Sequence, residues 1–135
     1  MNRSHIRMLA ALVFGGALLL SACGGDTAVA DLVSPGEAHV LLAEPPADLV
    51  VLDVRTPEEY AAGHLAGAIN INVEGSGFED AVGALDEDAP VFVYCRTGSR
   101  SANAITIMQD LGFTELYDLD GGIVDWIHAG LPTEK

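Results

Sequence analysis

The sequence predicts an α/β fold, in which one small domain holds a parallel β-sheet flanked by helices on both faces. Two apolar runs, Leu49–Val54 and Val91–Tyr94, have the continuous hydrophobic character of strands that are buried on both faces. Segments with helical spacing lie between such runs, and the alternation of strands with helices favours parallel pairing. About 105 residues follow the N-terminal segment, enough for one small core.

Capping residues predict where the first two helices begin. Ser34 is placed as an N-cap, Pro35 stands in the first turn, and Glu37 completes a capping box. The segment Thr56-Pro57-Glu58-Glu59 is expected to start a short helix that ends at Gly63. In chain order we expect a helix at 35–43, a strand at 49–54, a helix at 56–63, a strand at 68–71, a helix at 78–85, a strand at 91–94, a helix at 99–111, a strand at 116–119 and a helix from 121 to 129.

The reactive side chains are concentrated between the strand 91–94 and the helix that follows it. The segment reads Cys95-Arg96-Thr97-Gly98-Ser99-Arg100 and combines one thiol, two guanidinium groups and a glycine. Backbone N–H groups, the helix dipole and nearby cations all stabilise a thiolate in such a position. A lone cysteine is more often a small buried hydrophobe, but these neighbours favour a nucleophile. We therefore expect Cys95 to be the catalytic residue.

The other residues of this loop suit the binding of a small anion. Backbone N–H groups from Arg96 to Arg100, Thr97 and Ser99 included, are expected to point inward around the substrate. Gly98 permits a positive φ or a close approach of the backbone. We expect Arg96 to contact the substrate and Arg100, in the following helix, to brace the loop. Sites in parallel sheets form beyond the C-terminal ends of the strands, where this loop lies.

Two residues near the end of the first apolar strand are candidates for the border of the site. Asp53 and Arg55 lie at its C-terminal end, and a carboxylate within an apolar strand needs a partner. The competing interpretation of Arg55 is a structural salt bridge to Glu58 or Glu59. His64 is expected to hold a turn by hydrogen bonding rather than to act as a base.

The N-terminus has the pattern of an export signal. Arg3 and Arg7 precede an apolar stretch, residues 8–20, that is short for a membrane span. The sequence Leu20-Ser21-Ala22-Cys23 resembles the lipobox of bacterial lipoproteins, in which the cysteine is lipidated and becomes the mature N-terminus. The alternatives are a plain signal peptide cleaved nearby and an uncleaved helical anchor.

These features divide the chain into four parts. We expect a signal peptide at 1–22, a lipidated Cys23 with a tether to residue 28, a domain at 29–131 and a C-terminal tail at 132–135. The expected location is extracytoplasmic, with the chain anchored to a bacterial membrane through the lipid on Cys23. The domain is expected to be a monomer.

Charge and cysteine content narrow the range of partners. The chain has 6 Lys and Arg against 20 Asp and Glu, and loss of residues 1–22 removes two arginines and no acid, which leaves a formal charge of −16. Nucleic acids and anionic lipid surfaces bind clustered cations, so neither is an expected partner. With Cys23 lipidated, Cys95 has no disulfide partner. The scattered histidines give no zinc-ligand spacing, and we expect neither a metal nor a cofactor.

Four motifs, in their order and spacing along the chain, resemble those of a single domain of the rhodanese family, which consists of sulfurtransferases. The resemblance covers about residues 29–131. At Ala66 the family often has proline, and this departure is expected only to loosen a turn. The motifs are Asp53-Val54-Arg55 with Pro57-Glu58-Glu59-Tyr60, then Gly63-His64-Leu65-Ala66-Gly67-Ala68-Ile69-Asn70, the Cys95–Arg100 loop, and Gly121-Gly122-Ile123-Val124-Asp125-Trp126.

The resemblance implies that the Cys95 thiolate takes the sulfane sulfur of a small anionic donor such as thiosulfate. The resulting persulfide passes this sulfur to a thiol or to cyanide. A non-enzymatic persulfide carrier or redox sensor that docks to a partner protein would use the same cysteine, so the sequence leaves that alternative open. An inactive scaffold is disfavoured by the intact loop. Cysteine phosphatases typically have five residues between cysteine and arginine, whereas four separate Cys95 from Arg100. The shorter loop disfavours phosphatase activity.

Overall fold

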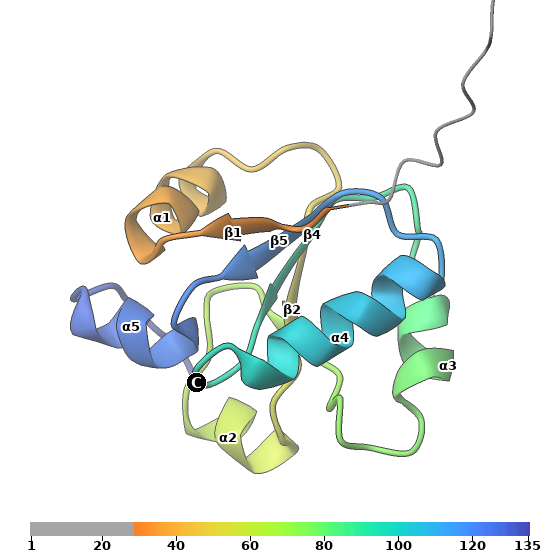
Figure 1. The fold of residues 1–135 in the computed structure, drawn as a ribbon. Coiled ribbons are helices and arrows are strands. Elements are labelled where there is room, and N and C mark those ends of the chain that lie inside the picture. The colour runs from red at the N-terminus through yellow and green to blue at the C-terminus, as the bar shows by residue number, and fades with distance from the viewer. Residues whose placement is uncertain (1–28) are drawn as a thin grey trace, which may run out of the picture.

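Five parallel strands form a central sheet in the order β1-β5-β4-β2-β3 in the computed structural model, which describes residues 29–135 (Figure 1). The predicted fold class is therefore confirmed. The predicted signal peptide, Cys23 and the tether lie outside the described residues. The elements are β1 (Asp31–Val33), α1 (Pro35–Ala43), β2 (Val50–Asp53), α2 (Pro57–Ala62), β3 (Ile69–Asn70), α3 (Phe78–Gly83), β4 (Val91–Tyr94), α4 (Ser99–Asp110), β5 (Leu116–Leu119) and α5 (Gly122–His128).

Helices pack on both faces of this sheet, with α1 and α5 on one side and α3 and α4 on the other (Figure 1). The central strand β4 shows why the sequence has continuous apolar runs. Its residues Phe92 and Tyr94 pack in the core with α1 and α5, while Val91 and Val93 pack in the core with α3 and α4. All four side chains are fully buried, because each face of the strand is covered.

The predicted helix starts are confirmed in atomic detail. The Ser34 hydroxyl accepts a hydrogen bond from the Glu37 backbone N–H at 3.4 Å, and the Glu37 carboxylate accepts one from the Ser34 backbone N–H at 2.9 Å. Thr56 and Glu59 form the same reciprocal pair at the start of α2. The predicted ends of the elements differ from the observed ones by one or two residues, as is common where helices and strands fray.

One strand, β1, has no counterpart in the sequence-based prediction. It covers three residues, Asp31–Val33, and pairs only with β5, at the edge of the sheet. Leu32 is 64% exposed, so the strand has no alternation of buried and exposed side chains from which to predict it. Backbone pairing with β5 places this segment in the sheet.

Hydrogen bonds attach the last residues of the chain to the rest of the domain. The backbone groups of Glu134 and His64 exchange two hydrogen bonds of 2.8 Å, and the indole N–H of Trp126 donates to the Pro132 carbonyl at 2.8 Å. The Nδ1 atom of His64 lies 3.0 Å from the Tyr60 carbonyl oxygen. The expected role of His64 in holding a turn is confirmed.

Residues 29–135 contain no helix that is both long and apolar enough to cross a bilayer. The longest of their helices, α4, has 12 residues, whereas a span requires about 20. Within the same part of the chain, no group of three or more His, Cys, Asp or Glu side chains is arranged to hold a metal ion.

The start of α5 approaches the Cys95–Arg100 loop at Gly122. The backbone N–H of Ile123 donates to the Cys95 carbonyl at 2.9 Å, and the N–H of Val124 donates to the Arg96 carbonyl at 3.2 Å. Gly122 has a φ of +63°, and a Cβ atom there would overlap the carbonyl groups of both loop residues. Glycine is therefore required for this contact between α5 and the loop.

We predict that Gly122→Ala lowers the free energy of unfolding by about 3–4 kcal/mol, because it adds both a steric overlap and backbone strain. Urea denaturation of the variant and the wild type measures this difference. Gly67→Ala is the matched control, since Gly67 has a φ of +73° with open space around the position of a Cβ. The control should lose only about 1–2 kcal/mol, and equal losses in the two variants would contradict the predicted overlap.

Candidate active site

Cys95 directly follows β4 at the C-terminal edge of the sheet, and the loop after it leads into α4. The side chain is almost completely buried, with 1% of its surface exposed. Its Sγ accepts a hydrogen bond of 3.0 Å from the backbone N–H of Gly98. Gly98 is the N-cap of α4 and has a φ of +114°, so the expected positive φ is confirmed. The sulfur thus lies beside the N-terminus of a helix.

Three carbonyl groups of the loop accept hydrogen bonds from α5 and from the first turn of α4. Those of Cys95 and Arg96 accept from α5, as described above. The Gly98 carbonyl accepts from the hydroxyl of Ser101 at 3.0 Å and from the N–H of Ala102 at 3.1 Å. Three oxygens that would repel an anion are thus already paired, which favours an arrangement in which N–H groups face the substrate.

Ser101 is a further contact of Cys95 and was not among the predicted site residues. The Cys95 thiol donates to the Ser101 hydroxyl oxygen over 3.5 Å, and the serine is fully buried. In the sequence its only distinguishing feature is its position directly after the loop. That position alone does not separate a serine facing the sulfur from one on the exposed side of the helix.

Arg100 forms a two-pronged ion pair with Glu59 of α2. Its Nη1 and Nη2 atoms lie 2.7 and 2.8 Å from the two carboxylate oxygens, and Glu74 lies 3.4 Å from Nη1. The hydrogen bonds from Arg100 lower the pKa of Glu59 to about 2, and those of Glu59 raise the pKa of Arg100. Sequence reasoning missed this role of Glu59, because no local pattern joins residues 41 positions apart.

Arg96 is placed differently from Arg100. Its side chain is exposed and forms no ion pair with any residue between 29 and 135. It lines a pocket of about 360 Å³ together with Arg55, with Glu59 of α2 and with apolar side chains of α5. Thr97 and Ser99 are also exposed, so the middle of the loop lies at the surface.

Asp53 and Arg55 form a buried ion pair at the end of β2. The guanidinium Nη2 and Nε atoms lie 2.6 and 3.0 Å from Oδ2 of the carboxylate, and Nη2 also donates to the Gly63 carbonyl at 2.7 Å. Burial opposes the charge of Arg55, but Asp53 outweighs it and the pKa of the guanidinium is raised. Arg55 also lies over the ring of Tyr94, 5.6 Å from its centre.

This pair corrects one expectation and satisfies another. The predicted partner of Arg55, either Glu58 or Glu59, was wrong, since the arginine binds Asp53 within its own strand end and Glu59 binds Arg100 instead. The partner that Asp53 needs in its apolar surroundings is Arg55. Arg55 lines the same pocket as Arg96, whereas Asp53 is fully buried and is not among the residues that line it.

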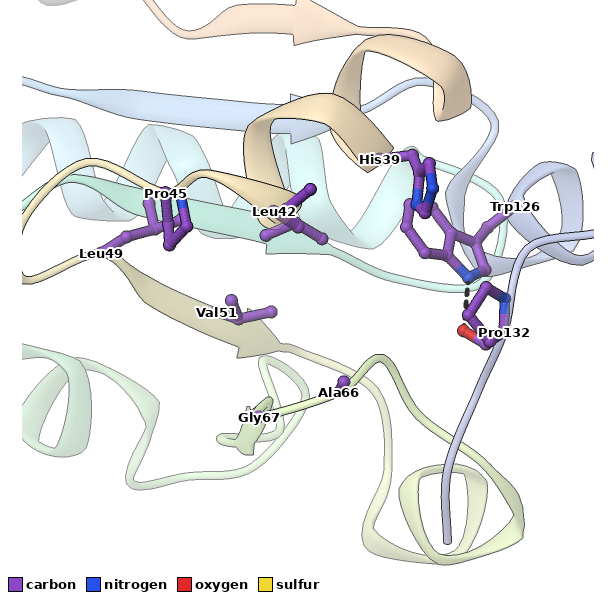
Figure 2. A pocket seen from close by; sticks show the side chains of 10 residues that line it. His39, Leu42, Pro45, Leu49, Val51, Ala66, Gly67, Trp126 and Pro132 are labelled. Carbon is purple, nitrogen blue, oxygen red and sulfur yellow. Dashed lines mark hydrogen bonds between the residues drawn. The ribbon is translucent and has the colours of Figure 1, made fainter.

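Figure 2 shows a second pocket, which has a volume of about 380 Å³. Its walls come from α1, the start of β2, the turn at Ala66 and Gly67, and the Trp126–Pro132 contact. None of its lining residues belongs to the 95–100 segment. It is therefore separate from the candidate active site.

Comparison with known proteins identifies the relatives of this chain. The model of the rhodanese-like domain family matches residues 34–129. The thiosulfate sulfurtransferase GlpE of Pseudomonas entomophila is 37% identical over 94 residues, which cover 70% of this chain and 82% of that protein. The chloroplastic thiosulfate sulfurtransferase 16 of Arabidopsis thaliana is 37% identical over 119 residues, which cover 81% and 97%.

Solved structures show the same architecture. A rhodanese-related protein from Thermoplasma volcanium is 31% identical, with a TM-score of 0.66 and coverage of 77% of this chain and 97% of that one. A Rhodopseudomonas palustris protein described as a possible tyrosine phosphatase is 26% identical, with a TM-score of 0.68 and coverage of 78% and 85%. The chain therefore belongs to the family of rhodanese-like domains, the sulfurtransferase family that its four motifs predicted.

Proposed function

We propose that this protein is a thiosulfate sulfurtransferase that carries the transferred sulfur as a persulfide on Cys95. The observation that carries the proposal is the position of the Cys95 sulfur, which accepts the Gly98 N–H beside the N-terminus of α4. Two relatives at 37% identity are thiosulfate sulfurtransferases, which supports the choice of donor.

The proposed reaction has two steps, which need one thiolate and no other redox group. The Cys95 thiolate attacks the outer sulfur of thiosulfate, the bond between the two sulfur atoms of thiosulfate breaks, and sulfite leaves with the electron pair. The cysteine then holds a persulfide anion. Cyanide or a thiolate attacks the outer sulfur of this persulfide, and the Cys95 thiolate leaves unchanged.

The two arginines of the loop are assigned different parts in this reaction. Arg96 is exposed and unpaired within the described residues and lines the pocket beside the loop, so we assign it contact with the anionic donor and stabilisation of sulfite. Arg100 is committed to Glu59 and Glu74 and holds α4 against α2. Its charge still acts at the sulfur over a longer range.

The first prediction concerns the persulfide itself. Incubation with thiosulfate should increase the intact mass of the full chain by one sulfur atom, about 32 Da, and cyanide should then remove it. In Cys95→Ser the increase should be absent, and in Cys23→Ala it should remain.

Thiocyanate release, measured in the same incubation with thiosulfate and cyanide, separates the enzyme from a carrier. Release of thiocyanate in many turnovers supports the enzyme. A persulfide that forms but passes its sulfur to no small acceptor would favour the carrier, and the absence of any sulfur adduct would contradict the role of thiosulfate.

The ion pair between Glu59 and Arg100 predicts a pH dependence of stability. The pKa of Glu59 is about 2 in the folded protein against an ordinary value of 4.5. Acid therefore protonates the unfolded chain first, and the stability from this pair is present above about pH 4.5 and is lost as the pH falls towards about 2. Urea midpoints of the wild type should fall more steeply over this interval than those of Glu59→Gln. Glu58→Gln, the neighbouring control, should follow the wild type, and equal slopes in all three proteins would refute the assignment.

We also propose that the protein is exported and anchored to a membrane through a lipid on Cys23. The support is the signal-like pattern of residues 1–22 and the lipobox-like sequence that ends at Cys23. Mass spectrometry of the N-terminal peptide from bacterial cells should show acyl chains on Cys23. Replacement by Cys23→Ala should release the protein from the membrane fraction. An unmodified chain that begins with Met1 would contradict this proposal.

A further inference from the structure

The pocket beside Arg96 has a lining of two kinds, and the proposed donor matches only one of them. Its volume of about 360 Å³ suits a small molecule. The lining combines charged groups with three apolar side chains of α5, which are Ile123, Val124 and Ile127. Thiosulfate and cyanide carry charge but have no hydrocarbon chain. Neither of them therefore accounts for the apolar part of the pocket.

The apolar wall of the pocket continues the buried face of α5 out to solvent. Ile123 is buried in the core, whereas Val124 is half-buried and Ile127 is 53% exposed. Residues three and four positions apart are neighbours on a helix surface, so Ile127 adjoins both of the others. An isoleucine that borders a pocket and is half in contact with water gains free energy when an apolar ligand covers it.

The charged groups of the pocket leave one positive charge uncompensated. Arg55 is paired with Asp53, and Glu59 is paired with Arg100. Arg96 is exposed and forms no ion pair within the described part of the chain. A ligand in this pocket therefore meets a guanidinium next to an apolar wall. This combination favours an anionic group that is attached to a hydrocarbon chain.

The apolar wall is joined to the loop that carries the sulfur. Arg96 directly follows Cys95, and the backbone N–H groups of Ile123 and Val124 donate to the carbonyls of these two loop residues at 2.9 and 3.2 Å. The first turn of α5 is thus fixed against the loop, and the helix leads away from it toward Ile127. A molecule that lies along this wall has one end beside the loop.

We propose that this pocket is the acceptor subsite and that it takes an aliphatic thiol with a carboxylate at its other end. The carboxylate pairs with Arg96, and the hydrocarbon chain covers Val124 and Ile127, so these residues determine acceptor specificity. The inference rests on the proposed function, in which Cys95 carries a persulfide. Arg96 serves both half-reactions, because sulfite leaves before the acceptor binds.

The transfer to such an acceptor needs no further reactant. The acceptor thiolate attacks the outer sulfur of the Cys95 persulfide, and a new bond forms between the two sulfur atoms. The bond from the outer sulfur to Cys95 breaks, and its electron pair stays on Cys95 as the thiolate. The acceptor leaves as its own persulfide anion, so the total charge is unchanged.

The test isolates this second half-reaction in the full chain with Cys23→Ala, whose one cysteine is Cys95. Cys95 is loaded with thiosulfate, the excess donor is removed, and transfer is followed as the loss of one sulfur atom from the intact mass. The acceptors are ω-mercaptohexanoate, ω-mercaptohexanol and mercaptoacetate, compared at equal concentrations of thiolate. The second-order rate constant of ω-mercaptohexanoate should be about tenfold above the others, since ω-mercaptohexanol lacks the carboxylate and mercaptoacetate lacks the chain.

Two exposed positions separate the two contacts. In Arg96→Gln, ω-mercaptohexanoate should lose its advantage over ω-mercaptohexanol, whereas Arg96→Lys should keep part of it. In Ile127→Ser, transfer to ω-mercaptohexanoate should fall about fivefold more than transfer to mercaptoacetate. Val40→Ser is the matched control and should react like the parent, because Val40 is 69% exposed and does not line the pocket. Circular dichroism checks the folding of every variant.

Equal rate constants for the three acceptors would overturn the proposal, as would an advantage of ω-mercaptohexanoate that survives either Arg96→Gln or Ile127→Ser. If cyanide removes the sulfur but none of the thiols does, the sulfurtransferase function stands and the acceptor subsite is refuted. If thiosulfate leaves no sulfur on Cys95, the proposed donor fails. Polysulfide, which gives a sulfur atom to a thiolate, then loads Cys95 for the same comparison, and a protein that neither donor loads contradicts both proposals.

Discussion

The geometry of the loop depends on the two hydrogen bonds that α5 donates to the carbonyls of Cys95 and Arg96. They fix the backbone at the start of the loop, while the N–H of Gly98, the N-cap of α4, donates to the Cys95 sulfur. A carbonyl that is bound by α5 is not free to turn toward an anion. The close approach at Gly122 makes this arrangement possible, so a residue 27 positions after the cysteine determines how the loop presents its N–H groups.

The charges of the molecule are organised around the same loop. The chain is strongly acidic, yet two of its few cations are bound by carboxylates, Arg55 by Asp53 and Arg100 by Glu59. These pairs hold the end of β2 and the start of α4, and among residues 29–135 they leave Arg96 as the exposed guanidinium beside Cys95. Under the proposed function, this guanidinium attracts the anionic donor to one region of a strongly acidic chain.

Sequence reasoning predicted those parts of the fold and site that local patterns encode. The apolar run of β4 predicted the central strand, and with it the position of the loop that begins at Cys95. The capping box at Ser34 and the segment that begins at Thr56 predicted two helix starts. Strand β1 was missed because only its backbone pairing with β5 defines it. Glu59 contacts Arg100 and Ser101 contacts Cys95 only because α2, β4 and α4 pack together. The residues next to these positions in the sequence do not predict that packing.

The parallel direction of all five strands gives the domain two different ends. The chain enters the sheet at Asp31, where β1 begins beside Tyr117 at the start of β5, whereas Cys95 follows the finish of β4. Whatever precedes residue 29 is thus attached at the opposite end of the sheet from the sulfur. A domain held at that end exposes the loop outward, toward diffusing small molecules or an approaching partner protein, rather than toward its own point of attachment.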